Sequence, residues 1–156
     1  MPDVDVEGMI EDCRSEVESG GFTVLALAGD DSGCDWAYSV GLDRNFGHPE
    51  LMIVGLDAPL AGVVVELLAT KVAEGTSLGA GGRVVMDGGL ELRVAEVDPL
   101  FRAQGDWFVL GREILSRYGT RWPRSLQLVW SDPMHGFPER PGDPRWLVRQ
   151  PVLFSV

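Results

Sequence analysis

The sequence predicts an α+β fold, with a mainly antiparallel sheet of five to seven strands and two or three packed helices in a single domain. Short apolar segments recur along the chain, and turns rich in Gly, Asp and Pro separate them. Longer segments repeat apolar residues at helical spacing. Strands joined by short turns favour antiparallel pairing. The chain has 156 residues, and a domain of this size buries about 68–70% of its unfolded surface.

The first part of the chain predicts one helix and one hairpin. Residues 3–19 form the predicted helix, with Asp3 or Asp5 as its N-cap and Gly20-Gly21 as its end. Its apolar residues keep a 3.6-residue spacing: Val6, Met9, Ile10, Cys13 and Val17. Residues 22–28 and 36–42 are predicted strands, and the polar turn between them makes an antiparallel hairpin.

The remaining helices and strands are predicted from apolar runs and from the Gly, Pro and Asp residues that end them. Residues 51–56 are apolar throughout, which predicts a strand buried on both faces. A core helix is expected over 57–74, with Asp57 as its N-cap. Strands 83–86 and 90–97 flank the turn Asp87-Gly88-Gly89. The C-terminal third predicts a helix over 106–117, a strand over 126–130, a loop over 131–144 and an extended segment over 146–154.

The predicted strand 36–42 has one bulky face and one bare face. Side chains alternate along a strand, so Trp36, Tyr38 and Val40 point one way and Ala37 and Ser39 the other. A bare face allows another backbone, or a ligand, to approach closely.

The loop that follows, residues 43–50, holds the pair His48 and Glu50 on either side of Pro49. Pro49 favours an extended conformation at His48, so both side chains are expected on one side of the loop. Such a pair can serve as an acid/base couple, a ligand clamp or part of a metal site. The alternative, which the sequence favours, is that both side chains cap backbone groups and fix the loop.

Combining these features gives a candidate ligand pocket near His48. Its residues are Tyr38, Ser39, His48, Glu50, Trp130 and Asp132. The second histidine of the chain, His135, lies near Asp132. If the two histidine loops meet, His48, Glu50, Asp132 and His135 offer a weaker alternative, a divalent metal site. No catalytic residue and no cofactor is assigned.

Two motifs in this region resemble the DUF4262 family. They are AYSVGL (37–42) and GHPELMIVGL (47–56), and the likeness continues in LQLVWSD (126–132), GFP (136–138) and RQPVL (149–153). It runs from about Gly21 to the end, which divides the chain into an N-terminal helix (1–20) and a family-like core (21–156). The resemblance implies a bacterial domain of unknown function, so it supplies no catalytic residues.

Charge excludes some partners. The net charge is −11, and an acidic chain repels phosphate backbones, so nucleic acid is not an expected partner. Residues 101–156 nevertheless carry 8 Arg against 5 acids. These arginines could hold a small anion, although pairing with the chain's own carboxylates is the favoured interpretation. The sequence shows neither a signal peptide nor a membrane span, so a cytoplasmic protein is expected.

These observations favour a small-molecule-binding domain and leave enzyme status open. One alternative is a non-catalytic interaction module, whose simplest version is a homodimer formed through apolar end strands. Another is a flavin- or metal-dependent enzyme, although no phosphate-binding signature supports a flavin. The ligand itself is not predicted.

Overall fold

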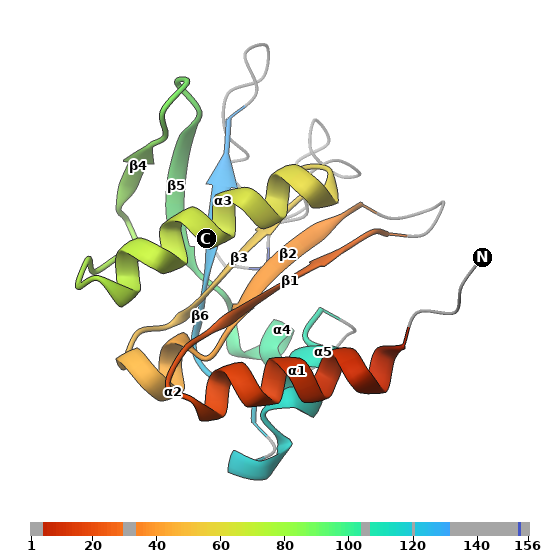
Figure 1. Ribbon diagram of the computed structural model, residues 1–156. Coiled ribbons are helices and arrows are strands. Elements are labelled where there is room, and N and C mark those ends of the chain that lie inside the picture. Colours follow the sequence, from red (N-terminus) through yellow and green to blue (C-terminus); the bar gives the residue numbers. More distant parts are fainter. Residues whose placement is uncertain (1–4, 30–33, 104–106, 120, 132–152, 154–156) are drawn as a thin grey trace.

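The computed structural model describes residues 5–29, 34–103, 107–119, 121–131 and 153, and it confirms an α+β domain built on one open sheet (Figure 1). The six strands are β1 (Thr23–Leu27), β2 (Trp36–Val40), β3 (Glu50–Val54), β4 (Arg83–Val85), β5 (Glu91–Glu96) and β6 (Ser125–Trp130). The helices are α1 (Val6–Glu18), α2 (Leu42–Phe46), α3 (Ala58–Ala73), α4 (Pro99–Ala103) and α5 (Val109–Ile114), followed by the short 3-10 helix η1 (Ser116–Tyr118).

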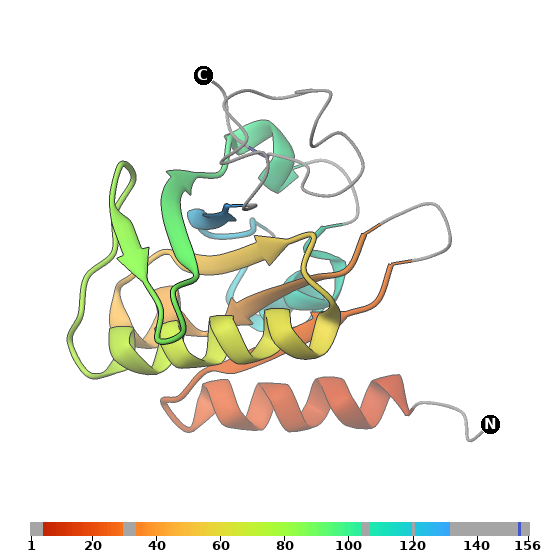
Figure 2. The same ribbon diagram turned by 90° about the horizontal axis from the view of Figure 1, so that it is seen from above.

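The sheet has the strand order β1-β2-β3-β6-β5-β4. Both predicted hairpins are present, β1–β2 and β4–β5, and they lie at opposite ends of the sheet (Figure 2). All pairs are antiparallel except β3 with β6, which run parallel. The starts of these two central strands therefore lie side by side, and the Glu50 amide donates to the Arg124 carbonyl at 2.9 Å.

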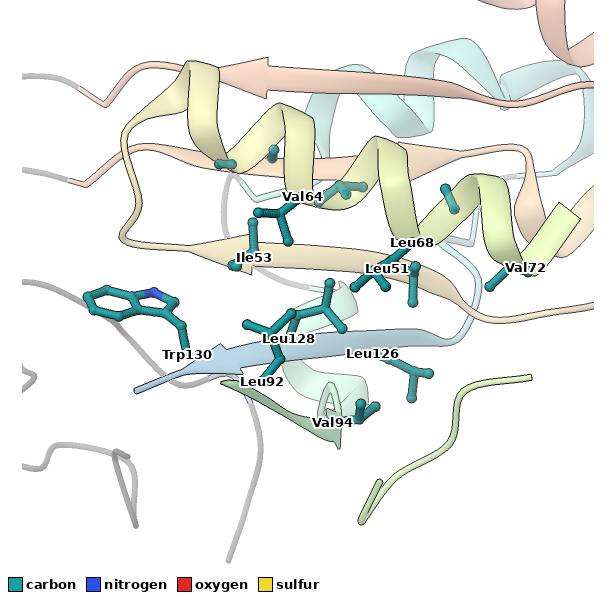
Figure 3. Close-up of a cluster of buried hydrophobic side chains, with 14 of the residues drawn as sticks. Leu51, Ile53, Val64, Leu68, Val72, Leu92, Val94, Leu126, Leu128 and Trp130 are labelled. Atoms are coloured by element: carbon teal, nitrogen blue, oxygen red, sulfur yellow. The ribbon is translucent and has the colours of Figure 1, made fainter. Parts of the chain in front are cut away.

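Helix α3 covers one face of the sheet. Its buried residues Val64, Leu68 and Val72 point toward side chains of β3 and β6 (Figure 3). The bare face of β2 lies on this side, because Ala37 is a fully buried member of the same cluster. The small side chains of β2 therefore allow close packing of α3, whose six buried residues are Ala61, Val64, Val65, Leu68, Ala69 and Val72.

The opposite face carries an aromatic cluster under α1 and α5. The rings of Phe108 and Trp122 stack with centroids 4.8 Å apart, and the Tyr38 ring meets both edge-on. Gly111 of α5 lies against this cluster, where its amide donates to the Tyr38 hydroxyl at 2.9 Å. The alternation predicted for the strand 36–42 holds as far as Val40, with Tyr38 and Val40 on this face, whereas Leu42, also predicted there, packs in the cluster under α3.

Several predicted boundaries differ from the structure, and helices α2 and α4 were not predicted. Strand β2 ends at Val40, not residue 42, because Gly41 adopts a positive φ of 116° and turns the chain into α2, inside the predicted loop. Helix α5 is shorter than the predicted 106–117. Helix α4 was not predicted at all; the Asp98 carboxylate accepts the Leu100 amide at its start.

The predicted loop 131–144 and the extended segment 146–154 lie outside the described residues, except for Ser131 and Leu153. Leu153 is buried, and its amide donates to the side-chain oxygen of Gln127 on β6 at 2.8 Å. Its carbonyl accepts the Asp98 amide. Residue 153 thus ties the end of the chain to β6 and to the start of α4.

Candidate functional site: an arginine pocket beside the His-Pro-Glu loop

Glu50 is a fully buried carboxylate that holds the start of α2. Its Oε1 accepts the Ser39 hydroxyl at 2.8 Å and the Leu42 amide at 3.1 Å. Its Oε2 accepts the amides of Gly41 at 2.9 Å and Asp43 at 3.4 Å. The first amides of a helix have no partner inside the helix, so Glu50 supplies their acceptors from β3. The sequence favoured a capping role for Glu50, and its carboxylate does accept backbone amides. The helix that it caps was not predicted, because its acceptor follows it in the chain.

The environment of Glu50 acts on its pKa in two directions. Burial raises the pKa of this carboxyl from 4.5 to about 7, because an ionised group loses hydration inside the protein. The backbone amides and the Ser39 hydroxyl donate to the carboxylate, which favours the ionised form and opposes this rise. Glu50 therefore changes protonation near neutral pH.

This raised pKa predicts a pH-dependent stability. The folded chain holds the Glu50 proton more tightly than the unfolded chain, so the contribution of Glu50 is fully present below pH 4.5 and is lost as pH rises through about 7. We expect the unfolding free energy of the wild type, measured relative to Glu50→Gln in urea, to fall across this interval. A difference that stays constant with pH would contradict the raised pKa.

His48 is buried and makes two hydrogen bonds of its own. Its Nδ1 lies 2.8 Å from the Pro49 carbonyl oxygen, and its Nε2 accepts the Leu78 amide at 2.9 Å. For Nε2 to accept, Nδ1 must carry the ring proton and donate it to Pro49. His48 thus joins the loop after α3 to the start of β3. Both ring nitrogens therefore bond backbone groups, as expected if His48 caps and fixes the loop.

A pocket of about 370 Å³ opens beside α2, where the chain leaves η1 and approaches β6. We call it the arginine pocket, and its lining residues are Asp43, Arg44, Arg102, Leu115, Tyr118, Gly119, Arg121, Trp122 and Pro123. Helix α2 supplies Asp43 and Arg44, and α4 supplies Arg102. Leu115 at the end of α5, Tyr118 of η1 and the segment before β6 supply the rest. The volume lies in the range of small-ligand sites.

The pocket is electropositive although the chain as a whole is acidic. Three arginines against one aspartate leave two positive charges in excess at a site of a chain whose net charge is −11. The Arg44 guanidinium lies over the Tyr118 ring, with Cζ 3.7 Å from the centroid. Stacking uses the face of the guanidinium and leaves its N–H edges for an acceptor. Such edges match carboxylate and phosphate oxygens.

Arg102 lines the pocket and also carries a buried N–H group. Its Nε is buried and has no hydrogen-bond partner among the residues that the structure describes. A buried N–H without an acceptor costs about 1–3 kcal/mol. Other arginines of the C-terminal third are paired: Arg117 with Glu18 and Arg124 with Glu96. The expected pairing with the chain's own carboxylates therefore holds for these two but does not account for Arg102.

Among the sequence-predicted site residues that the structure describes, none lines the arginine pocket. Ser39 and Glu50 bond each other beneath α2, and the Tyr38 ring packs on Trp122, which does line the pocket. Trp130 lies on the α3 face, where its Nε1 donates to the Val54 carbonyl at 2.8 Å. Asp132 and His135 lie outside the described residues.

The described part of the chain holds neither a metal-binding cluster nor a membrane-spanning helix. Among those residues, no cluster of three or more His, Cys, Asp or Glu side chains could hold a metal ion. The metal alternative includes Asp132 and His135, so it stays a prediction. Within the same residues, every helix is too short or too polar to cross a membrane.

The signal that could have located the pocket is the local reversal of charge after residue 100. The arginines after residue 100 suggested a small-anion site. They did not identify the full set of pocket arginines, because Arg44 comes from the acidic part of the sequence. Only the parallel pairing of β3 with β6 brings α2 beside the segment that precedes β6.

Comparisons with known proteins give one match. The family described as "Domain of unknown function (DUF4262)" matches residues 16–144, which is well over half of the chain. No curated protein and no solved structure matches.

Proposed function

We propose that this chain, which belongs to the DUF4262 family, binds a small organic anion in its arginine pocket. The observation that carries the proposal is the convergence of Arg44, Arg102 and Arg121 on one cavity of an acidic protein. Placing three like charges together is unfavourable without an anion, and a bound carboxylate or phosphate would offset their repulsion.

The remaining lining indicates that the ligand also carries an apolar or aromatic group. Leu115, Tyr118, Trp122 and Pro123 form apolar surface next to the arginines. Small-molecule sites typically combine apolar walls with a few polar groups that fix the orientation of the ligand. An anionic group would bind the guanidinium edges, while the rest of the ligand packs on these side chains.

A thermal shift screen tests this proposal. The probes are phenyl phosphate and benzoate, with neutral benzamide as the charge control. A ligand that binds only the folded chain raises stability by RT ln(1 + [L]/Kd), which is about 2.7 kcal/mol at 100-fold saturation. We expect the two anions to raise the melting temperature of the wild type and benzamide to leave it unchanged.

Two variants locate the effect. Arg102→Gln removes a pocket charge and should abolish most of the shift. Arg83→Gln removes an exposed charge on β4, away from the pocket lining, and should keep it. Equal shifts in both variants, or none in the wild type, would refute the proposal.

The alternatives from the sequence remain predictions. Light scattering at several protein concentrations tests the homodimer, and a monomer at every concentration would exclude it. The visible absorbance of the purified protein tests for a bound flavin. The DUF4262 match supplies no reaction, and the described lining of the arginine pocket argues for binding rather than for a particular chemistry.

A further inference from the structure

We propose that Glu50 is the positioning residue of the arginine pocket: it fixes two of the pocket's walls and thereby sets the affinity for the anion. This inference rests on the proposed function, because it assigns a role to Glu50 within the same site. Glu50 does not line the pocket. Its effect would therefore pass through α2 and through the segment before β6.

The first wall is α2, which has only five residues. An isolated helix of this length is not stable in water, so other parts of the chain must hold it in place. The Glu50 carboxylate accepts three successive amides at its start, those of Gly41, Leu42 and Asp43. Asp43 and the next residue, Arg44, are the residues of α2 that line the pocket.

A second anchor holds the other side of α2. The Asn45 side chain donates to the carbonyls of Val17 at 2.8 Å and Gly21 at 2.7 Å. This anchor joins α2 to the end of α1, whereas Glu50 joins it to β3. The buried Leu42 side chain and the His48 amide, which donates to the Leu42 carbonyl at 3.3 Å, also hold α2. Loss of the Glu50 acceptor should still loosen the first turn of α2, and Arg44 with it.

The second wall is the segment that leads into β6. The backbone amide of Glu50 donates to the Arg124 carbonyl, next to the pocket residues Trp122 and Pro123. The same residue thus bonds α2 through its side chain and this segment through its backbone. Its neighbour in the motif, His48, accepts the Leu78 amide through its ring and donates to the Leu42 carbonyl of α2 through its backbone, but neither of these bonds reaches the segment before β6. In the His-Pro-Glu motif, Glu50 is therefore the residue that bonds directly to both walls of the pocket.

Glu50→Gln tests the role of the carboxylate with little change in volume. A Gln oxygen can replace only one carboxylate oxygen, so its NH₂ group would face amides that also donate. We expect the Kd for phenyl phosphate, measured by calorimetry at fixed pH, to rise roughly tenfold to a hundredfold, the loss expected when one charged hydrogen bond is removed. Val64→Ala, a core truncation on the α3 face, is the control for lost stability, and its Kd should stay within about twofold of the wild type.

The Nε–H resonances of the arginines give a readout that a purely structural role would not move. In Glu50→Gln, the Arg44 resonance should lose both its ring-current shift from Tyr118 and its response to phenyl phosphate, while the Arg102 response persists. Wild-type affinity with an unchanged Arg44 resonance would overturn the inference and leave the proposed function standing. If the wild type itself does not bind phenyl phosphate, both are overturned.

A milder variant decides the question if Glu50→Gln does not fold. Ser39→Ala removes the hydroxyl that donates to Glu50 Oε1 and accepts the Leu51 amide. It leaves the carboxylate and the α2 amides in place. A smaller rise in Kd with a partly shifted Arg44 resonance would support the positioning role. Unchanged values for both would overturn it.

Discussion

Glu50→Ala is expected to lower the unfolding free energy at neutral pH by about 4 kcal/mol or more. The substitution leaves the Ser39 hydroxyl and the amides of Gly41 and Leu42 without this acceptor in a buried site, and it removes the longer, part-buried bond to the Asp43 amide. Each unsatisfied buried donor costs about 1–3 kcal/mol, and the cavity left by the side chain adds to this loss. Since a domain of this size is stable by roughly 5–15 kcal/mol, the variant would be close to unfolding.

Glu96→Ala is the matched control, because it removes a carboxylate that is exposed. Glu96 pairs with Arg124, and their side chains are 40% and 63% exposed. An exposed ion pair contributes at most about 1 kcal/mol. Urea unfolding of both variants therefore compares the free energy lost with a buried carboxylate with that lost with an exposed one. Similar losses from Glu50→Ala and Glu96→Ala would show that the buried network around Glu50 contributes little.

Gly111→Ala is expected to destabilise the protein by about 3 kcal/mol, although alanine is the better helix former by about 1 kcal/mol. A Cβ at Gly111 would lie 2.5 Å from Trp122 Cζ3 and 2.8 Å from Tyr38 Cε2. Neither ring can yield easily, because each packs on the other and on Phe108. Overpacking of a rigid core typically costs 1–3 kcal/mol and occasionally more.

The control for this substitution is Gly62→Ala, another glycine in the interior of a helix. A Cβ there would meet only the Ala26 Cβ, at 3.2 Å, so a small shift suffices. We expect its unfolding free energy to stay within about 1 kcal/mol of the wild type, since the gain in helix preference offsets the tight contact. If Gly111→Ala proves as mild as Gly62→Ala, the aromatic cluster must be looser than the structure shows.

Regular elements could be predicted from the sequence because their patterns are local. The periodicity of α1 and α3, the apolar run of β3 and the Asp-Gly-Gly turn each depend on residues close together in the chain. The α2 helix could not be predicted in this way. It has no capping side chain at Gly41, and the acceptor that stabilises its start comes from Glu50, eight residues after Leu42.

The candidate site also combines a motif that is local in the sequence with lining residues that lie far apart in it. The sequence singled out the His-Pro-Glu loop, whereas the lining of the arginine pocket comes from α2, α4 and the segment before β6. Arg44 and Arg121 are 77 positions apart in the printed sequence. Their meeting depends on strand order, in particular on β6 pairing with β3 in parallel, which short-range patterns do not specify.

The most direct measurement of the central claim is a titration of the labelled protein with phenyl phosphate, followed through the arginine Nε–H resonances. If the arginine pocket binds anions, the resonances of Arg44, Arg102 and Arg121 shift together and saturate with one Kd. Those of Arg83 and Arg117, which pair with Glu91 and Glu18 outside the pocket lining, stay in place. Equal shifts at all of these arginines, or no shift at the three pocket arginines, would contradict the account.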